Sequence, residues 1–225
     1  MKKIQYLEWD TNFFGFKIGK LITNRNINLN ALQNTSYKLI YIYSNTNLNN
    51  IMPIDTKVIF KKNINQLNIY NLESIEEFDV MKHSYTELLD LVYLSGIHSR
   101  FKIDNKFSDI DFKRLYQKWI DESINKNIAF SVLIKTIKKE IAGFITLEIA
   151  NEKTSKIGLI AVSPKFQGKG IATQLIKKAE TVSKEEGFIE LQVATQLINK
   201  PAINLYKKNG FKMHSVTNIY HLWNK

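Results

Sequence analysis

The stretch Lys165–Leu175, KFQGKGIATQL, constrains the fold and the chemistry of this chain more than any other. Gly168 and Gly170 stand one residue apart in a chain with nine glycines, where a strand-like apolar run gives way to a helix-like one. Glycine lowers stability by about 0.5–1 kcal/mol relative to alanine inside a helix, so a pair of them at this junction needs a reason. The pattern indicates either a bare turn or a place where the backbone closely approaches a ligand.

A strand, a glycine loop and a helix in this order form an anion-binding site. We expect a strand over residues 153–163 before the loop and a helix from Ile171 after it. Unpaired backbone N–H groups converge at such a helix start, and the helix dipole adds about half a positive charge there. Side chains at positions 168 and 170 would block a phosphate from these amides. The sequence therefore predicts that the turn binds phosphate.

Two common phosphate-binding motifs fit the stretch poorly. A P-loop requires Gly-Lys-Ser/Thr after a four-residue spacer, and the chain contains no such run. The dinucleotide fingerprint G-x-G-x-x-G would have Thr173 in place of its third glycine. Its acidic residue, expected about 20 residues further on, would have to be Glu190 or a neighbour. The match to either motif is weak.

The same residues match a third motif. Residues 167–172, QGKGIA, resemble the Q/R-x-x-G-x-G/A loop that binds the acyl-CoA pyrophosphate in the GNAT N-acyltransferase superfamily. Residues 199–211, NKPAINLYKKNGF, resemble the second signature of that superfamily, N-x-x-A-x-x-L-Y-x-x-x-G-F. On these two signatures and their order along the chain, the protein is identified as a member of the superfamily.

Further stretches resemble the bacterial dTDP-fucosamine acetyltransferase family, whose members N-acetylate the 4-amino group of a dTDP-linked 4-amino-4,6-dideoxyhexose. They are residues 7–20, 98–101, 115–124 and 191–211. The resemblance implies an acetyl-CoA-dependent N-acetyltransferase acting on a nucleotide-linked amino-deoxy sugar for surface polysaccharide biosynthesis. The amine would attack the thioester directly. The alternative is a GNAT enzyme acting on another amine, in an antibiotic, a polyamine or a protein.

The superfamily resemblance also implies how acetyl-CoA, the co-substrate, is held, and it implies no metal. The pantetheine arm would pair with strand backbone between two splayed parallel strands, and the loop amides would hold the pyrophosphate. Asn199 would hydrogen-bond the carrier arm, with a helix N-cap as a compatible alternative. The implied cofactor-binding residues are Ile160, Ala161, Val162, Gln167, Gly168, Lys169, Gly170, Ile171, Ala172, Asn199 and Tyr206.

Two residues are candidates for proton transfer. Tyr206 falls on the signature tyrosine, whose phenol can donate a proton to the departing thiolate. The alternative is a tyrosine that only packs against the carrier arm. Glu148, in the strand expected over residues 139–150, is the candidate base by its position. An exposed strand carboxylate, with water serving as the base, is the alternative.

Three residues are candidates for binding the acceptor. Trp9 and Phe14 lie in the stretch WDTNFFG, which recurs in the resembling family. Arg100 could bind the diphosphate of a nucleotide sugar, because a guanidinium group binds phosphate bidentately. The alternatives are aromatic residues of the core and a structural arginine.

Hydrophobic periodicity predicts a mixed α/β chain in two parts. From about residue 82 we expect two helices, three strands, a helix, a strand, a helix and closing strands. The resemblance implies that these elements form the GNAT fold, with a central mixed twisted sheet flanked by helices. We assign residues 76–225 to this acyltransferase domain and residues 1–75 to a smaller α/β domain on the acceptor side. In the latter we expect strands, and a short helix that begins within residues 44–50.

Composition narrows the functional classes. The chain has no cysteine, which excludes disulfides, cysteine-zinc sites and a thiol nucleophile. Its net charge is +11, yet its lysines are dispersed without a block of about five or six like charges. We therefore expect phosphorylated small molecules as partners rather than nucleic acid. No apolar run reaches the roughly 18–20 residues of a membrane span, so we expect a cytoplasmic protein, either monomeric or a homodimer.

Overall fold

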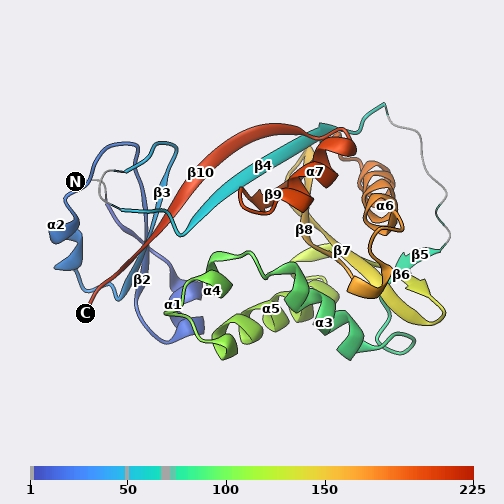
Figure 1. The fold of residues 1–225 in the computed structure, drawn as a ribbon, viewed down its shortest axis with the longest axis horizontal. Coiled ribbons are helices and arrows are strands. Elements are labelled where there is room, and N and C mark those ends of the chain that lie inside the picture. Colours follow the sequence, from blue (N-terminus) through green and yellow to red (C-terminus); the bar gives the residue numbers. More distant parts are fainter. Residues whose placement is uncertain (1–2, 49–50, 67–71, 73) are drawn as a thin grey trace. The chain divides into compact units, whose positions relative to one another are not determined.

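The computed structural model describes residues 3–48, 51–66, 72 and 74–225 (Figure 1). The chain forms two compact units. Unit 1 comprises Met1–Val58, Gln196–Ile198 and Ser215–Lys225, and unit 2 comprises Ile59–Thr195 and Asn199–His214. The division into domains at residue 75 stays a prediction. No helix in the described ranges is both long and apolar enough to span a membrane.

Unit 1 is a small α/β layer. Its elements are β1 (Gln5–Tyr6), α1 (Glu8–Phe14), β2 (Ile18–Ile22), α2 (Leu29–Gln33), β3 (Leu39–Ser44), the first part of β4 (Asp55–Asn63) and the last part of β10 (Lys212–Trp223). Strand β2 lies between β1, to which it is antiparallel, and β3, to which it is parallel, and β3 pairs antiparallel with β10. The hydrophobic core of unit 1 contains a cluster of six buried residues: Leu21, Leu32, Ile40, Ile42, Leu48 and Tyr220.

The prediction of a short helix within residues 44–50 is wrong for residues 44–48, which are the described part of this range. The hydroxyl of Ser44 donates to the carbonyl of Thr46 and accepts from the N–H of the same residue, which fixes a turn there. The helix α2 forms earlier instead, where the Asn28 side chain accepts the N–H of Ala31 at 3.3 Å and caps it. Local side-chain hydrogen bonds therefore decide which asparagine-rich tract becomes helical.

From about residue 82 onwards, unit 2 has the predicted order of helices and strands, with one short helix in addition. Its elements are β5 (Ile75–Glu77), α3 (Tyr85–Ser95), α4 (Arg100–Ile103), α5 (Asp109–Ile124), β6 (Ala129–Ile137), β7 (Glu140–Asn151), β8 (Thr154–Val162), the 3-10 turn Pro164–Phe166, α6 (Ile171–Glu185), β9 (Glu190–Gln196), α7 (Lys200–Lys208) and the remaining parts of β4 and β10. The added helix is α4.

The sheet of unit 2 is mixed and covered on both faces, as predicted. Its strand order is β4-β9-β8-β7-β6-β5, in which β5 to β8 are antiparallel neighbours and β8 and β9 are parallel. Helices α3 and α5 pack on one face and α6 on the other (Figure 1). Fully buried residues from these layers, such as Leu115, Phe144 and Leu175, form the core. Apolar burial of this kind is the dominant stabilising term in folding.

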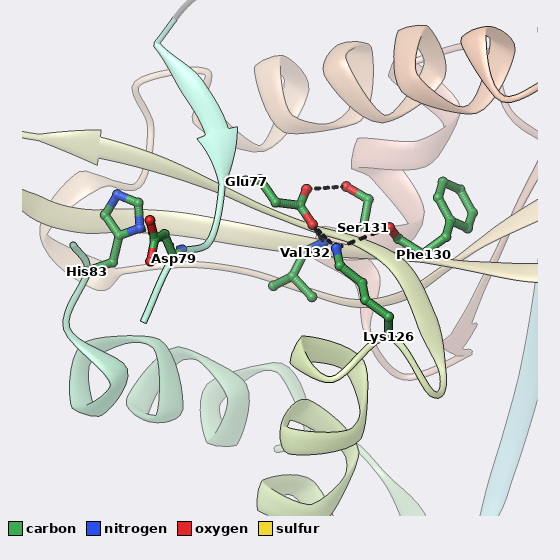
Figure 2. A network of polar contacts seen from close by, with 7 residues as sticks. All are labelled: Glu77, Asp79, His83, Lys126, Phe130, Ser131 and Val132. Atoms are coloured by element: carbon green, nitrogen blue, oxygen red, sulfur yellow. Dashed lines mark hydrogen bonds and ion pairs between the residues drawn. The ribbon is translucent and has the colours of Figure 1, made fainter. Parts of the chain in front are cut away.

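The edge strand β5 is fastened by a polar network that serves the fold (Figure 2). The Glu77 carboxylate accepts the N–H of Val132 at 3.0 Å, the hydroxyl of Ser131 at 2.7 Å, and the ammonium of Lys126. Nearby, Nδ1 of His83 accepts the backbone N–H of Asp79 at 2.9 Å, and the His83 side chain is only 10% exposed. These groups satisfy one another, so the network holds β5 in place and is not a candidate site.

Candidate functional site

Strands β8 and β9 run side by side over only part of their length. Parallel ladder pairs join them from Thr154 and Glu190 to Ile157 and Val193, and no later residues of the two described strands pair with each other. On its other edge β8 stays paired with β7 as far as Val162. The two strands therefore diverge after Ile157, and the second half of β8 has an edge that β9 does not cover.

A β-bulge begins this divergence. Gly158 and Leu159 both lie opposite Thr146 of β7, because the pairing register shifts by one residue there. The buried Thr146 hydroxyl accepts the N–H of Leu159 at 2.8 Å, which stabilises the extra residue. A bulge bends its strand and increases the local twist, so it can turn β8 away from a neighbour.

Two backbone N–H groups of β8 face the open edge. The N–H groups of Leu159 and Ser163 both donate toward β7. Because successive residues of a strand point their N–H groups to opposite sides, that of Ala161 also faces β7, and those of Ile160 and Val162 face the divergence. An extended ligand could pair with these groups as an added strand.

The glycine loop leads from β8 into α6 in a backbone conformation that favours glycine. Gly168 and Gly170 have φ angles of +75° and +74°, and a Cβ atom added at either would meet nothing within 4 Å. Gly170 is the N-cap of α6 and provides no side-chain hydrogen bond to the first-turn amides. These amides therefore border open space, as a phosphate-binding turn requires.

A cavity of about 380 Å³ lies at this helix start. Six of the residues predicted to bind the cofactor line it: Val162, Gln167, Gly168, Gly170, Ile171 and Ala172. The amide of Gln167 also donates to the carbonyl of Val162 at 3.3 Å, which ties the loop to the end of β8. Lys169 lies instead over the ring of Phe166, 5.2 Å from its centroid.

The rest of the cavity wall was not predicted. It comprises Phe166, Thr173, Pro201, Asn204, Leu205 and Lys208. The last four share one face of α7, at spacings of three, four and seven residues from Pro201, whereas Ile203 and Tyr206 of the same helix are buried. This face adds the Asn204 amide and the Lys208 ammonium group to the cavity wall, and the helical period marks its four residues as neighbours without specifying that they face the cavity.

Tyr206 and Asn199 lie in α7 or at its start. Tyr206 is 3% exposed, its ring lies near those of Phe60 and Phe211, and burial raises the pKa of its phenol. None of the described residues hydrogen-bonds that phenol, and Tyr206 is not among the residues that line the cavity at the start of α6. Asn199 is the N-cap, where its side-chain oxygen accepts the N–H of Ala202 at 3.2 Å.

Glu148 lies on β7, where Gly158 makes room for its carboxylate. The side chain is 15% exposed, and one oxygen accepts from the ammonium of Lys156, its direct partner on β8, at 2.8 Å. A Cβ atom at Gly158 would stand only 1.8 Å from the other oxygen and 2.8 Å from the Thr146 hydroxyl. The bulge and the carboxylate therefore depend on the same glycine, and any side chain there would displace one of them.

The three residues predicted to bind the acceptor belong to different units. Trp9 and Phe14 lie on α1 of unit 1, where Trp9 is 48% exposed and stacks on Phe13 with centroids 5.1 Å apart. Arg100 begins α4 in unit 2, and its guanidinium lies 4.6 Å from the ring centroid of Phe101. Their shared role in acceptor binding stays a prediction.

A comparison with protein-family models agrees with this geometry. Residues 96–211 match the model described as the acetyltransferase (GNAT) family, which covers the open edge of β8, the glycine loop and α7. The chain belongs to the acetyltransferase (GNAT) family. Its mixed α/β fold is that of solved GNAT relatives.

Several curated proteins are similar to this GNAT chain. The spore coat polysaccharide biosynthesis protein SpsD of Bacillus subtilis is 27% identical over 136 residues, which are 60% of this chain and 46% of SpsD. The dTDP-fucosamine acetyltransferase of Escherichia coli is 28% identical over 103 residues, 45% of this chain and 43% of that enzyme. The spermidine N(1)-acetyltransferase of Thermoplasma acidophilum is 25% identical over 142 residues, 62% and 85% of the respective chains. The matched part of this GNAT chain thus spans less than half the length of SpsD and of the dTDP-fucosamine acetyltransferase.

Solved structures share the fold at lower identity. A functionally unknown conserved protein of Staphylococcus epidermidis has a TM-score of 0.62 at 13% identity, over 93% of this chain and 85% of its own. A GNAT-family protein of Novosphingobium aromaticivorans has a TM-score of 0.54 at 12% identity, over 86% and 77% of the chains. These likenesses support the GNAT fold.

Replacing Gly170 tests the loop as an anion site. In Gly170→Ala, we expect a stability loss of about 1 kcal/mol from a residue held at positive φ, and at least a tenfold weaker Kd for coenzyme A, because the methyl group enters the space over the amides. The matched control is Gly187→Ala, since Gly187 has a φ of +88° and equally open surroundings beyond the other end of α6. Denaturant unfolding and calorimetry with coenzyme A measure both effects. Equal binding by the two variants would contradict the assignment.

Proposed function

We propose that the chain is an acetyl-CoA-dependent N-acetyltransferase whose acceptor is the amine of a dTDP-linked amino-deoxy sugar. The observation that carries the proposal is the uncovered edge of β8, which ends at the cavity where the α6 amides meet open space. An edge of this kind suits an extended arm, and the cavity suits a diphosphate at its end. Acetyl-CoA has both parts in that order.

The carrier lies along β8 in this proposal. The pantetheine amides pair with the backbone of Ile160 and Val162, and the pyrophosphate accepts from the amides of residues 167–172. Lys208 and Asn204 contribute further donors from α7. One of the two β8 N–H groups polarises the thioester carbonyl, a contribution of about 3–4 kcal/mol for a well-aimed oxyanion donor.

The transfer itself needs a base and an acid. The neutral amine attacks the thioester carbon, so that a C–N bond forms, and the C–S bond breaks as the tetrahedral intermediate collapses. The amine loses one proton, which Glu148 accepts directly or through water, and the departing thiolate takes the proton of the Tyr206 phenol. Because burial raises the pKa of Tyr206, the phenol keeps that proton until a strong base forms beside it.

Lys156 and Gly158 prepare the base. The ammonium of Lys156 donates to one oxygen of the Glu148 carboxylate at 2.8 Å and so fixes its orientation. Gly158 leaves the space in which the second carboxylate oxygen lies. We therefore propose Glu148 as the catalytic base, held by these two residues of β8.

The charge of the chain supports an anionic acceptor. A net charge of +11 attracts a nucleotide diphosphate and repels cationic amines such as polyamines, because the summed field of a protein changes the local concentration of charged substrates. Two relatives carry names that mention spore coat polysaccharide biosynthesis and dTDP-fucosamine. Another relative is named for spermidine, which keeps a polyamine as the second candidate acceptor. The substrates would place the enzyme in the cytoplasm, in a pathway of surface polysaccharide synthesis.

Removing the phenol tests the acid. Tyr206→Phe should lower kcat by roughly 100-fold, within the range for loss of a general acid, because the thiolate then leaves unprotonated. The Kd for acetyl-CoA should stay within about twofold, since the ring and its packing remain. Single-turnover kinetics and calorimetry separate the two quantities. A wild-type rate in this variant would remove the phenol from the mechanism.

A double-mutant cycle tests the base and its glycine. Glu148→Gln should lower kcat/KM by roughly 100-fold at neutral pH, and Gly158→Ala should lower it comparably because the methyl group displaces the carboxylate. The double variant should lose less activity than the sum of the two single losses, since the glycine acts in part through that carboxylate. Losses that add would show that Gly158 acts by another route, and a normal rate for Glu148→Gln would show that water or another group is the base.

A panel of acceptors tests the substrate class. With acetyl-CoA, thiol release and product mass spectrometry should detect acetylation of dTDP-linked amino sugars in preference to spermidine, streptothricin or lysine peptides. The KM for the favoured acceptor should rise with salt, because screening weakens the attraction of the basic chain for an anion. Turnover of spermidine with dTDP-linked sugars inert would replace the proposed acceptor by the polyamine.

A further inference from the structure

Unit 1 contains a second cavity, whose described lining includes none of the residues proposed for acyl transfer. It has a volume of about 670 Å³, within the roughly 300–1,000 Å³ of small-molecule sites. The segment from the end of β2 into α2 provides its described lining: Leu21, Thr23, Asn24, Arg25, Asn26, Ile27, Asn28 and Leu32. A single continuous stretch of the chain therefore forms most of one wall.

The floor of this cavity is apolar and fixed in the core. Leu21 and Leu32 are 4% and 3% exposed and belong to the main hydrophobic cluster of unit 1, against which Ile27 also packs. Thr23 is buried beside them, and its hydroxyl accepts the N–H of Arg25 at 3.2 Å. An apolar floor favours an organic ligand over a bare inorganic ion.

The polar wall offers hydrogen-bond donors. The side-chain oxygen of Asn24 accepts the N–H of Asn45 at 3.0 Å, and that of Asn28 accepts the N–H of Ala31 at 3.3 Å. Because the loop uses these oxygens, the two amides have their NH₂ groups left for a ligand. Arg25 adds a guanidinium group, and no described lining residue is acidic. Such a wall favours a ligand that is anionic and rich in acceptors.

Arginine suits this ligand better than lysine. The chain has 32 lysine and arginine residues, of which only Arg25, Arg100 and Arg114 are arginine. A guanidinium group is a planar fork that binds phosphate bidentately, whereas an ammonium group acts as a point charge. One of these three guanidinium groups, that of Arg25, therefore lies on the wall of a cavity that is rich in hydrogen-bond donors and has an apolar floor.

We infer that this cavity is a binding site for a nucleoside diphosphate. The phosphates accept from Arg25 and the two asparagine amides, and the nucleoside lies against the floor of Leu21, Ile27 and Leu32. The inference rests on the proposed function in one respect, because it assigns the nucleotide part of the acceptor to this site.

Calorimetry on the full chain, saturated with coenzyme A, tests the site with dTDP as the probe. Saturation keeps dTDP out of the α6 cavity. We expect dTDP to bind, thymidine and inorganic pyrophosphate to bind at least tenfold more weakly, and Arg25→Ala to weaken dTDP binding at least tenfold. No binding of dTDP to the wild-type chain, or pyrophosphate binding as tightly as dTDP, would overturn the inference.

Two control variants separate binding from folding. Asn28→Asp preserves the N-cap, because aspartate caps helices as well as asparagine, but it replaces the NH₂ donor by a negative charge. It should lose dTDP binding without loss of thermal stability. Arg114→Ala removes the same charge from an exposed arginine that is paired with Asp111 on α5, and it should bind dTDP normally. Wild-type affinity in both Arg25→Ala and Asn28→Asp would overturn the site.

The same variants keep this inference apart from the proposed function. If dTDP binds through Arg25 but no dTDP-linked amine is acetylated, the site stands and the proposed acceptor fails. If dTDP-linked amines are acetylated and Arg25→Ala leaves their KM unchanged, the acceptor stands and this site fails.

Discussion

One extra residue in β8 is the constraint on which the site depends. With regular pairing, β8 and β9 would stay hydrogen-bonded beyond Ile157, and the edge that faces the divergence would already be occupied. The bulge opposite Thr146 interrupts this pairing, and glycine at its first position leaves the space that the Glu148 carboxylate occupies. The open edge, the proposed carrier site and the placement of the proposed base thus follow from a single irregularity in one strand pair.

The sequence predicted those features that turn residues and hydrophobic periodicity determine, namely the glycine turn and the order of elements. Gly168 and Gly170 both have positive φ, and the predicted order of elements in unit 2 is confirmed. The bulge was not predicted, because Gly158 lies in an otherwise regular apolar run that is typical of an uninterrupted strand. A lone glycine in a strand indicates a bulge only weakly, and the register that sets it against Thr146 is a property of the sheet.

Residues that enter the site through tertiary packing were beyond the reach of the sequence. Lys208 and Asn204 line the α6 cavity because α7 docks with Ile203 and Tyr206 inward, which the helical period permits but does not specify. Likewise, the pairing of Glu148 with Lys156 follows from strand register. The expected helix within residues 44–50 failed for the opposite reason, since a short hydroxyl-to-backbone turn there outweighed helix propensity.

The basic side chains of the two cavities can bind an anion because no acidic residue of the described lining competes for them. Glu148, Glu180 and Glu190 are each paired with a lysine, and desolvation still raises the pKa of the buried Glu180 carboxyl. Neither of the two cavities has an acidic residue in its described lining, and each has one basic side chain and several amide donors. The net charge of +11 therefore attracts any anion at long range, whereas the two cavities offer hydrogen-bond donors at fixed positions. The proposed transfer between two phosphorylated substrates would need both, because electrostatic steering alone does not distinguish one anion from another.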